Sequence, residues 1–210
     1  MTSVAYTRFL PDVQTSLTGC PIPTAINAIR NAAIDFCTKT NVWQETQDVE
    51  MVAATGLPMD LTGPTEAMVI QVLSCKVDGR LLEPVTIDYL DSRHHNWEEH
   101  TGTPLVYFQP NTAQLTLYPL PANAVPLRLR VAYAPTRVSN GLDSALYDNN
   151  LTTIAAGALA ALMVIPEVPW SNAKLAMYYA AIYSFGVDEA LSNTQKSFTR
   201  ARNRVRSNPF

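Results

Sequence analysis

The stretch from His94 to His100 holds the residues best suited to chemistry. Three imidazoles and two carboxylates lie close together there: His94, His95, Glu98, Glu99 and His100. These groups bind zinc, and a zinc-bound water would support a metal-dependent hydrolase. Their order, however, differs from the His-Glu-x-x-His arrangement, in which two histidines share one helical face. We therefore interpret the stretch as a solvated loop, and we expect no bound metal and no cofactor.

Two other common catalytic motifs are missing from the sequence. It contains no Gly-x-Ser-x-Gly elbow and no glycine-rich phosphate loop, and it has only eight glycines in all. Both motifs use glycine for a tight turn or for a close approach of the backbone to a phosphate. We therefore expect a protein that is not an enzyme, with the metal-dependent hydrolase as an alternative.

Three tyrosines near residue 180 admit two interpretations. Tyr178, Tyr179 and Tyr183 could stack against nucleic acid bases, but they follow one another at helical spacing in a stretch rich in Ala and Leu. Tyrosines in such a setting usually pack in cores and interfaces, with their hydroxyl groups bonded at the edge. We predict that these tyrosines, together with Leu162, lie at an interface between subunits.

The end of the chain is basic. No acidic residue follows Glu189, and residues two apart on a helix point in nearly opposite directions, so the positive charges would surround this segment. Encircling charge with apolar anchors suits insertion into an acidic, partly apolar groove of a partner. We interpret residues 192–210 as a docking segment. Its proposed contact residues are Phe198, Arg200, Arg202, Arg204, Val205, Arg206 and Phe210.

Residues 151–187 predict the helical hairpin around which the chain is organised. Small and apolar side chains fill every position from Ile154 to Ile165, and a helix that is apolar all round must be buried on several sides. This run is shorter than the roughly 20 residues that span a bilayer, so protein rather than lipid should cover it. Prolines end the helix, and Ser171 or Asn172 is placed to cap a second one.

The second helix either bends at Gly186 or continues to about Arg206, and in the second case it would be roughly 50 Å long. An earlier amphipathic helix is predicted from near Pro23 to just before Val42, because proline suits the first turn of a helix. Residues 1–22 contain several prolines and are predicted to form an extended arm.

Between the helices the pattern changes to short β-strands. Ala67–Val77 and Arg80–Ile87 flank Asp78-Gly79, a pair that favours a hairpin turn. A short helical turn over residues 87–93 and the polar loop come next. Three further strands are predicted at residues 105–109, 114–118 and 127–134, and the last alternates cleanly between apolar and other residues. Consecutive strands of this kind predict an antiparallel sandwich or barrel-like insertion.

The sequence thus predicts an α+β fold. Its expected parts are an N-terminal arm (1–22), a helical body (23–43 and 144–191), a β-rich insertion (48–136) and the docking segment (192–210). Charged residues make up only 16% of the chain, against 47% hydrophobic residues, so we expect other subunits to cover much of the surface. The net charge of −3 argues against a surface that binds nucleic acid throughout. The three cysteines have no metal-binding spacing, and no signal peptide is evident, which favours reduced thiols in a cytosolic product.

Several short motifs together resemble the head-to-tail adaptor, or connector, proteins of short-tailed bacteriophages. These motifs are Phe36-Cys37 with Trp43, Gly102-Thr103-Pro104 running into Tyr107, Leu117 to Pro121, the Ala-rich hairpin broken by Pro166 and Pro169-Trp170, and the basic stretch ending at Phe210. The resemblance covers nearly the whole chain. It implies a ring, usually dodecameric, that binds beneath the portal, with the C-terminal segment docked on the portal and the β-rich part facing the tail.

The resemblance also implies the partners and the location. The expected partners are further copies of the chain, the portal protein and tail or nozzle proteins, with double-stranded DNA passing through without specific binding and with no membrane contact. The expected location is the virion neck, after synthesis in the host cytoplasm. The alternative is another virion structural component, such as a tail-completion or tail-tube protein.

Overall fold

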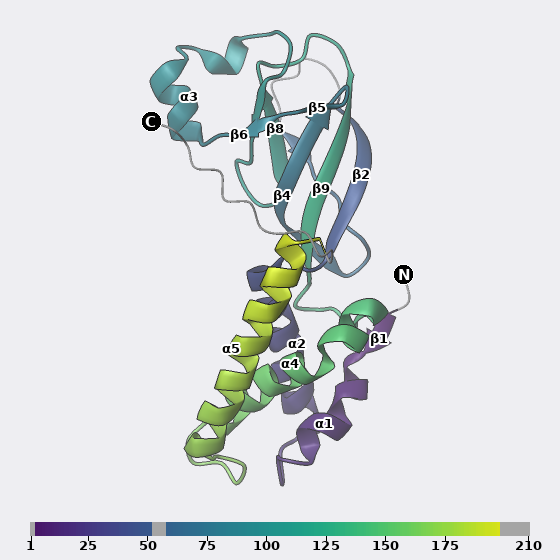
Figure 1. The fold of residues 1–210 in the computed structure, drawn as a ribbon, viewed down its shortest axis with the longest axis vertical. Helices are drawn as coiled ribbons and strands as arrows, with labels where there is room; N and C mark the ends of the chain where they lie inside the picture. Colours follow the sequence, from purple (N-terminus) through teal and green to yellow (C-terminus); the bar gives the residue numbers. More distant parts are fainter. Residues whose placement is uncertain (1–2, 52–57, 198–210) are drawn as a thin grey trace. The chain divides into compact units, whose positions relative to one another are not determined.

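The computed structural model describes residues 3–51 and 58–197. The chain forms two compact units, which Figure 1 shows as a group of helices and a group of strands. The helical unit comprises residues 1–42 and 135–210, and the β unit comprises residues 43–134. The predicted α+β class is confirmed.

The N-terminal segment is folded rather than extended, so the predicted arm over residues 1–22 is wrong. Strand β1 (Ser3–Ala5) pairs antiparallel with β10 (Gly141–Asp143), and the short helices η1 (Tyr6–Phe9) and α1 (Leu10–Gln14) follow it. Tyr6, Phe9 and Val13 are buried. The sequence pattern did not reveal these elements because each is too short to show a periodic spacing of apolar residues. The prolines suggested an extended chain instead.

Helix α2 (Ile22–Thr40) begins close to the predicted position, with Pro23 in its first turn. Its buried side chains recur every three or four residues and include Ile29, Ala33 and Phe36. Asn41 ends the helix in the left-handed conformation, with φ 49°, as a residue with a short polar side chain can do.

Helices α4 (Ser144–Met163) and α5 (Ala173–Gln195) form the predicted hairpin and lie side by side (Figure 1). The prediction placed the start of α4 at Leu151, but the Asp143 side chain caps it earlier by accepting a hydrogen bond from the Ala145 backbone N–H (3.0 Å). The Asn172 side chain caps α5 in the same way. The latter helix runs through Gly186 without a break and ends at Gln195, and Ser197 has a positive φ of 52°. The predicted uninterrupted helix to about Arg206 is therefore wrong, and residues 198–206 lie outside the described part of the chain.

In its described residues, the β unit contains two four-stranded sheets that share one hydrophobic core. The first has the order β2 (Gln44–Met51), β9 (Val125–Pro135), β4 (Ala67–Val77) and β5 (Arg80–Leu81). The second has the order β3 (Met59–Asp60), β8 (Gln114–Tyr118), β7 (Val106–Phe108) and β6 (Glu83–Pro84). Side chains of both sheets, including Val131 and Leu117, meet in the core. This is the sandwich that the strand pattern predicts.

Three details of the β unit differ from the prediction. The insertion begins at Trp43 rather than Asp48, because the polar strand β2 pairs with β9 along its whole length. The predicted strand Arg80–Ile87 is divided between β5 and β6, and β6 pairs with β7 in parallel. The turn at Asp78-Gly79 is confirmed, since both residues have positive φ. Helix α3 (Ile87–Arg93) matches the predicted helical turn, and η2 (Trp97–Glu99) follows it.

Candidate subunit interface

The inner face of α5 packs on the other helices of its own unit. Ala176, Val187 and Ala190 are buried along it, while Tyr179 and Tyr183 are half-buried. These residues recur at helical spacing and form a single stripe. The stripe therefore belongs to the core of the helical unit.

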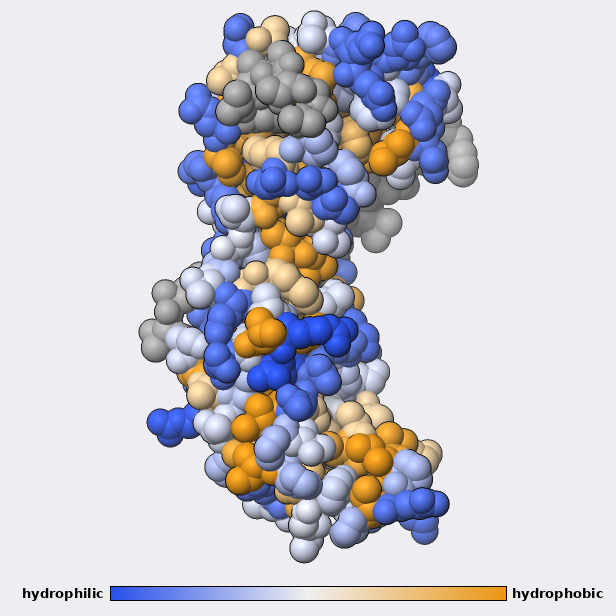
Figure 2. Space-filling model, turned by 180° about the vertical axis from the view of Figure 1, so that it is seen from behind, coloured by the Kyte–Doolittle hydropathy of each residue, from blue (hydrophilic) through white to orange (hydrophobic). Residues whose placement is uncertain are grey.

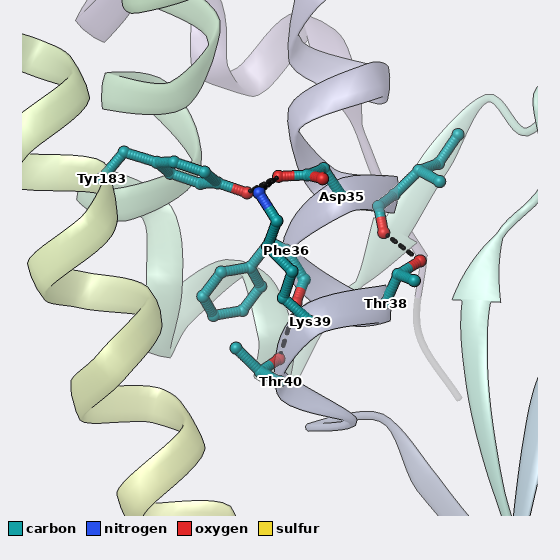
Figure 3. A network of polar contacts seen from close by, with 7 residues as sticks. Asp35, Phe36, Thr38, Lys39, Thr40 and Tyr183 are labelled. Atoms are coloured by element: carbon teal, nitrogen blue, oxygen red, sulfur yellow. Dashed lines mark hydrogen bonds and ion pairs between the residues drawn. The ribbon is translucent and has the colours of Figure 1, made fainter.

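Tyr183 is bonded to α2 within the unit, as Figure 3 shows. Its hydroxyl donates a hydrogen bond to Asp35 Oδ2 (2.7 Å), and Lys39 Nζ donates to the same oxygen (2.6 Å). The Lys39 ammonium also lies 5.6 Å from the centroid of the Tyr183 ring. Burial, followed by the hydrogen bond to Asp35 and the Asp35 carboxylate charge, raises the pKa of Tyr183 above its ordinary value of 10.0. The hydroxyl is thus a permanent donor that ties α5 to α2.

Two glycines allow α4 and α5 to approach closely. A Cβ atom at Gly157 would lie 2.8 Å from the ring of Tyr183, and one at Gly186 would collide with Thr153 Oγ1. Neither position has room for a side chain unless its neighbour moves. Gly186 therefore serves helix packing, which explains why α5 does not bend there.

The structure places the four predicted interface residues in different environments. Leu162 is only 2% exposed and packs inside its own unit. The Tyr179 hydroxyl lies 3.2 Å from Ser16 Oγ, and Tyr183 is held by Asp35. Tyr178, in contrast, is 59% exposed. Among the four, Tyr178 is the residue with most of its side chain available to another molecule.

The outer face of α5 carries a row of exposed apolar residues, which we call the outer ridge. It consists of Tyr178, Ala181 and Phe185, at spacings of three and four residues on the side opposite the inner stripe. Phe185 is 72% exposed, and Met177 beside the ridge is also exposed. A large aromatic side chain with this much exposure is typical of a binding surface.

A groove of about 450 Å³ lies between α2 and α4, and we call it the α2–α4 groove. Its apolar lining is made of small residues and two larger side chains, Leu162 and Ile165, and Tyr183 borders it from α5. Polar side chains of α2 also line the groove, among them Thr24, Asn27 and Asn31. On the face of the helical unit drawn in Figure 2, hydrophobic residues gather in patches beside strongly hydrophilic ones.

Sequence reasoning missed Phe185 as an interface candidate, and it missed the groove. Helical periodicity could have identified Phe185, because its position on the helix lies opposite Ala176 and Tyr183 and so on the outer face. The groove depends on how far apart two helices pack, and no local pattern carries that information.

Aromatic side chains of the histidine stretch pack against residues of the neighbouring strands β7 and β8. The rings of His94 and His100 lie 4.8 Å and 5.9 Å from that of Tyr118, and Trp97 makes an edge contact with Phe108. Residues 3–51 and 58–197 contain no group of three His, Cys, Asp or Glu side chains placed to hold a metal ion. Two of the three imidazoles thus have a structural partner in Tyr118.

The predicted docking residues lie outside the described part of the chain. Phe198, Arg200, Arg202, Arg204, Val205, Arg206 and Phe210 all follow Ser197, the last residue described. Their role stays a prediction. In the described residues, no helix is both long and apolar enough to span a membrane.

Comparison with known proteins identifies the family. A protein-family model described as SU10 adaptor protein matches residues 5–208, which is nearly the full length and includes both structural units. No curated protein sequence matches the chain significantly. The match agrees with the resemblance seen in the sequence motifs. The chain therefore belongs to the SU10 adaptor protein family, a family of phage head-tail adaptors.

Proposed function

We propose that this adaptor is the subunit of a ring, dodecameric as in the connectors it resembles, that joins the portal of the head to the tail in the virion neck. The observation that carries the proposal is the outer ridge, because an adaptor subunit with exposed Phe185 and Tyr178 leaves apolar surface that another protein must cover. Residues 192–210 dock on the portal, and the β unit faces tail or nozzle proteins. The centre of the ring continues the DNA channel.

The position at which α5 ends suggests a truncated chain that tests portal docking. Gln195 ends the helix, and the last buried residue of α5 is Ala190, so a chain that stops after Ser197 keeps all the described contacts of the helical unit. The truncated subunit should remain folded and soluble but should not co-sediment with DNA-filled heads that lack the adaptor. The full-length chain is the positive control.

A second variant distinguishes the contribution of the arginine charges to portal binding from that of the apolar anchor residues. Replacing Arg202, Arg204 and Arg206 with alanine should slow attachment and make it less dependent on salt, because surface charge mainly accelerates encounter. If the truncated chain still attaches to heads and closes them, the C-terminal segment is not the docking element, and the β unit becomes the next candidate. If the full-length chain does not attach to heads, the adaptor ring itself is disproved.

A further inference from the structure

The outer ridge and the α2–α4 groove are two different surfaces of the same unit. The ridge lies on the face of α5 that points away from the inner stripe, whereas the groove is bordered by Tyr183 of that stripe. A contact between these surfaces in two copies would be heterologous, since each copy would contribute its ridge on one side and its groove on the other. Repetition of such a contact closes into a ring when the rotation permits it.

The two surfaces have matching shapes. Ala28, Ala32, Gly157 and Ala161 line the groove with small side chains, so a projecting row of residues from another helix can enter. The ridge is such a row, with a small residue, Ala181, between two exposed aromatic rings. Thr24, Asn27 and Asn31 offer amide and hydroxyl groups that the Tyr178 hydroxyl can bond at the edge of the contact.

The two surfaces also lie at the same level along α5. Tyr183, which borders the groove, falls between Tyr178 and Phe185 of the ridge in the sequence of a single helix. Neighbours in a closed ring are related by rotation without translation along the axis. For helices aligned with that axis, the ridge of one copy therefore overlaps in height with the end of the next copy's groove that Tyr183 borders.

Charge supports this pairing. Lys39 lies beside Tyr183 at one end of the groove, and its side chain is 53% exposed. Asp188 and Glu189 are exposed on α5 about one turn after Phe185, at the corresponding end of the ridge. Lys39 already pairs with Asp35 of its own copy, so the stronger argument is the repulsion that two facing ridges would create by bringing these carboxylates together. This repulsion favours the heterologous contact over one between two ridges.

We propose that the outer ridge of each copy packs into the α2–α4 groove of the next copy, and that this single repeated contact closes the ring. The inference rests on the proposed adaptor ring and names the surfaces that build it.

Disulfide cross-linking in assembled particles tests the contact. The double variant Ala181→Cys with Asn31→Cys places one thiol on the ridge and one in the groove, while the three native cysteines are buried. Heads carrying the full-length variant, after mild oxidation, should yield a ladder of covalent dimers, trimers and larger species on a non-reducing gel. Neither single variant should cross-link, because a heterologous contact brings together two different residues.

The other outcomes decide between the two proposals. Cross-linked dimers from the Ala181→Cys single variant would show that ridges meet each other, and bound adaptors without a ladder would show that the copies meet elsewhere. Each result overturns the ridge-to-groove contact while leaving the adaptor ring in place. A double variant and an unmodified chain that both fail to bind heads would overturn the ring as well.

A pair of charge variants provides an independent measurement. Phe185→Asp should reduce the number of adaptors bound per head by about tenfold or more, since a buried aromatic anchor carries much of the energy of an interface. Val138→Asp is the matched control because Val138 is 80% exposed on the same unit but belongs to neither surface. Equal binding by the two variants would overturn the proposal, provided that both subunits show the thermal unfolding of the parent chain.

Discussion

Gly186 shows how a single residue determines the distance between two helices. Replacing it with alanine would place a Cβ atom 3.0 Å from Thr153 Cβ and still closer to the other atoms of that side chain. Alanine is otherwise the better helix former, by about 1 kcal/mol at most. Because overpacking outweighs this gain, Gly186→Ala should lower the free energy of unfolding by about 1 to 2 kcal/mol, as measured by chemical denaturation.

Ser184→Ala is the matched control for this substitution. Ser184 is exposed on the same helix, and alanine is smaller than serine and the better helix former, so the variant should be as stable as the parent chain or slightly more stable. If Gly186→Ala also left the free energy of unfolding unchanged, the result would mean that α4 and α5 can move apart at Thr153 without cost.

The cysteines report on burial through their ionisation. Burial raises the pKa of Cys37 and of Cys75 from 9.0 to about 12, and these two thiols therefore remain neutral in the folded chain well above pH 9. Their contribution to the free energy of unfolding is complete below pH 9 and falls as the pH rises from 9 towards 12, because only the unfolded chain then releases these protons. At pH 8 a thiol reagent should label Cys37 and Cys75 only after denaturation. Rapid labelling of the native protein would contradict the burial.

At the scale of elements, α4 and α5 should respond differently to the same new charge. Leu162→Asp would bury a carboxylate among apolar helices and should reduce the free energy of unfolding by more than about 3 kcal/mol, leaving aggregated protein. Tyr178→Asp changes an exposed position and should reduce it by about 0.5 kcal/mol or less. Thermal unfolding of the two isolated subunits measures the difference.

Of these two variants, only Tyr178→Asp can therefore test assembly. A folded Tyr178→Asp subunit with reduced binding to heads would support a role at the interface, whereas an unfolded one would show that the outer face of α5 is part of the core. The same logic excludes Leu162 as a reporter of subunit contacts.

The elements that sequence could predict are those with a clear apolar period. Helix α2 and the hairpin follow the spacing of buried residues, and β9 alternates because one of its faces lies on the core. Strand β2 escaped prediction because an edge strand of polar residues such as Glu45 and Asp48 shows little apolar alternation. The start of α4 escaped because its first two turns are mostly polar.

The candidate interface could be predicted only in part, for a related reason. A helical wheel separates the outer Tyr178 from the inner Tyr183, yet the tyrosines of α5 look alike in a list of apolar residues. The α2–α4 groove arises from helices that are more than a hundred residues apart in sequence. Its shape is a property of packing, which local spacing does not encode.

At the scale of the whole molecule, the β unit should fold by itself. It has its own core, and its two ends are adjacent, since the N–H of Tyr133, the residue before the last, donates a hydrogen bond to the carbonyl of the first residue, Trp43 (2.8 Å). A fragment of residues 43–134 should unfold cooperatively in denaturant. The matching test joins Val42 to Pro135 through a short glycine linker and should leave a folded helical unit. Failure of both proteins to fold would show that each unit depends on the other.

The distribution of charge along the chain predicts its behaviour towards DNA. Within residues 43–134, acidic side chains outnumber basic ones by eleven to five, while the basic residues near the C-terminus belong to the proposed docking segment. The full-length chain should therefore bind double-stranded DNA weakly at low salt, and the chain that stops after Ser197 should bind less. Electrophoretic mobility shifts at several salt concentrations provide the measurement. Sequence-specific binding at physiological salt would contradict a passive channel.

The adjacent ends of the β unit also have a mechanical consequence. The chain enters through β2 and leaves through β9, and these strands pair over eight residues from Gln44 opposite Ala132 to Met51 opposite Val125. A force that draws the β unit away from the residues flanking it would pull both strands in the same direction. The tension then divides between two covalent chains in parallel, and little of it acts to separate the hydrogen bonds between the strands. An adaptor built in this way can carry a load between its two units while its β-sheet remains intact.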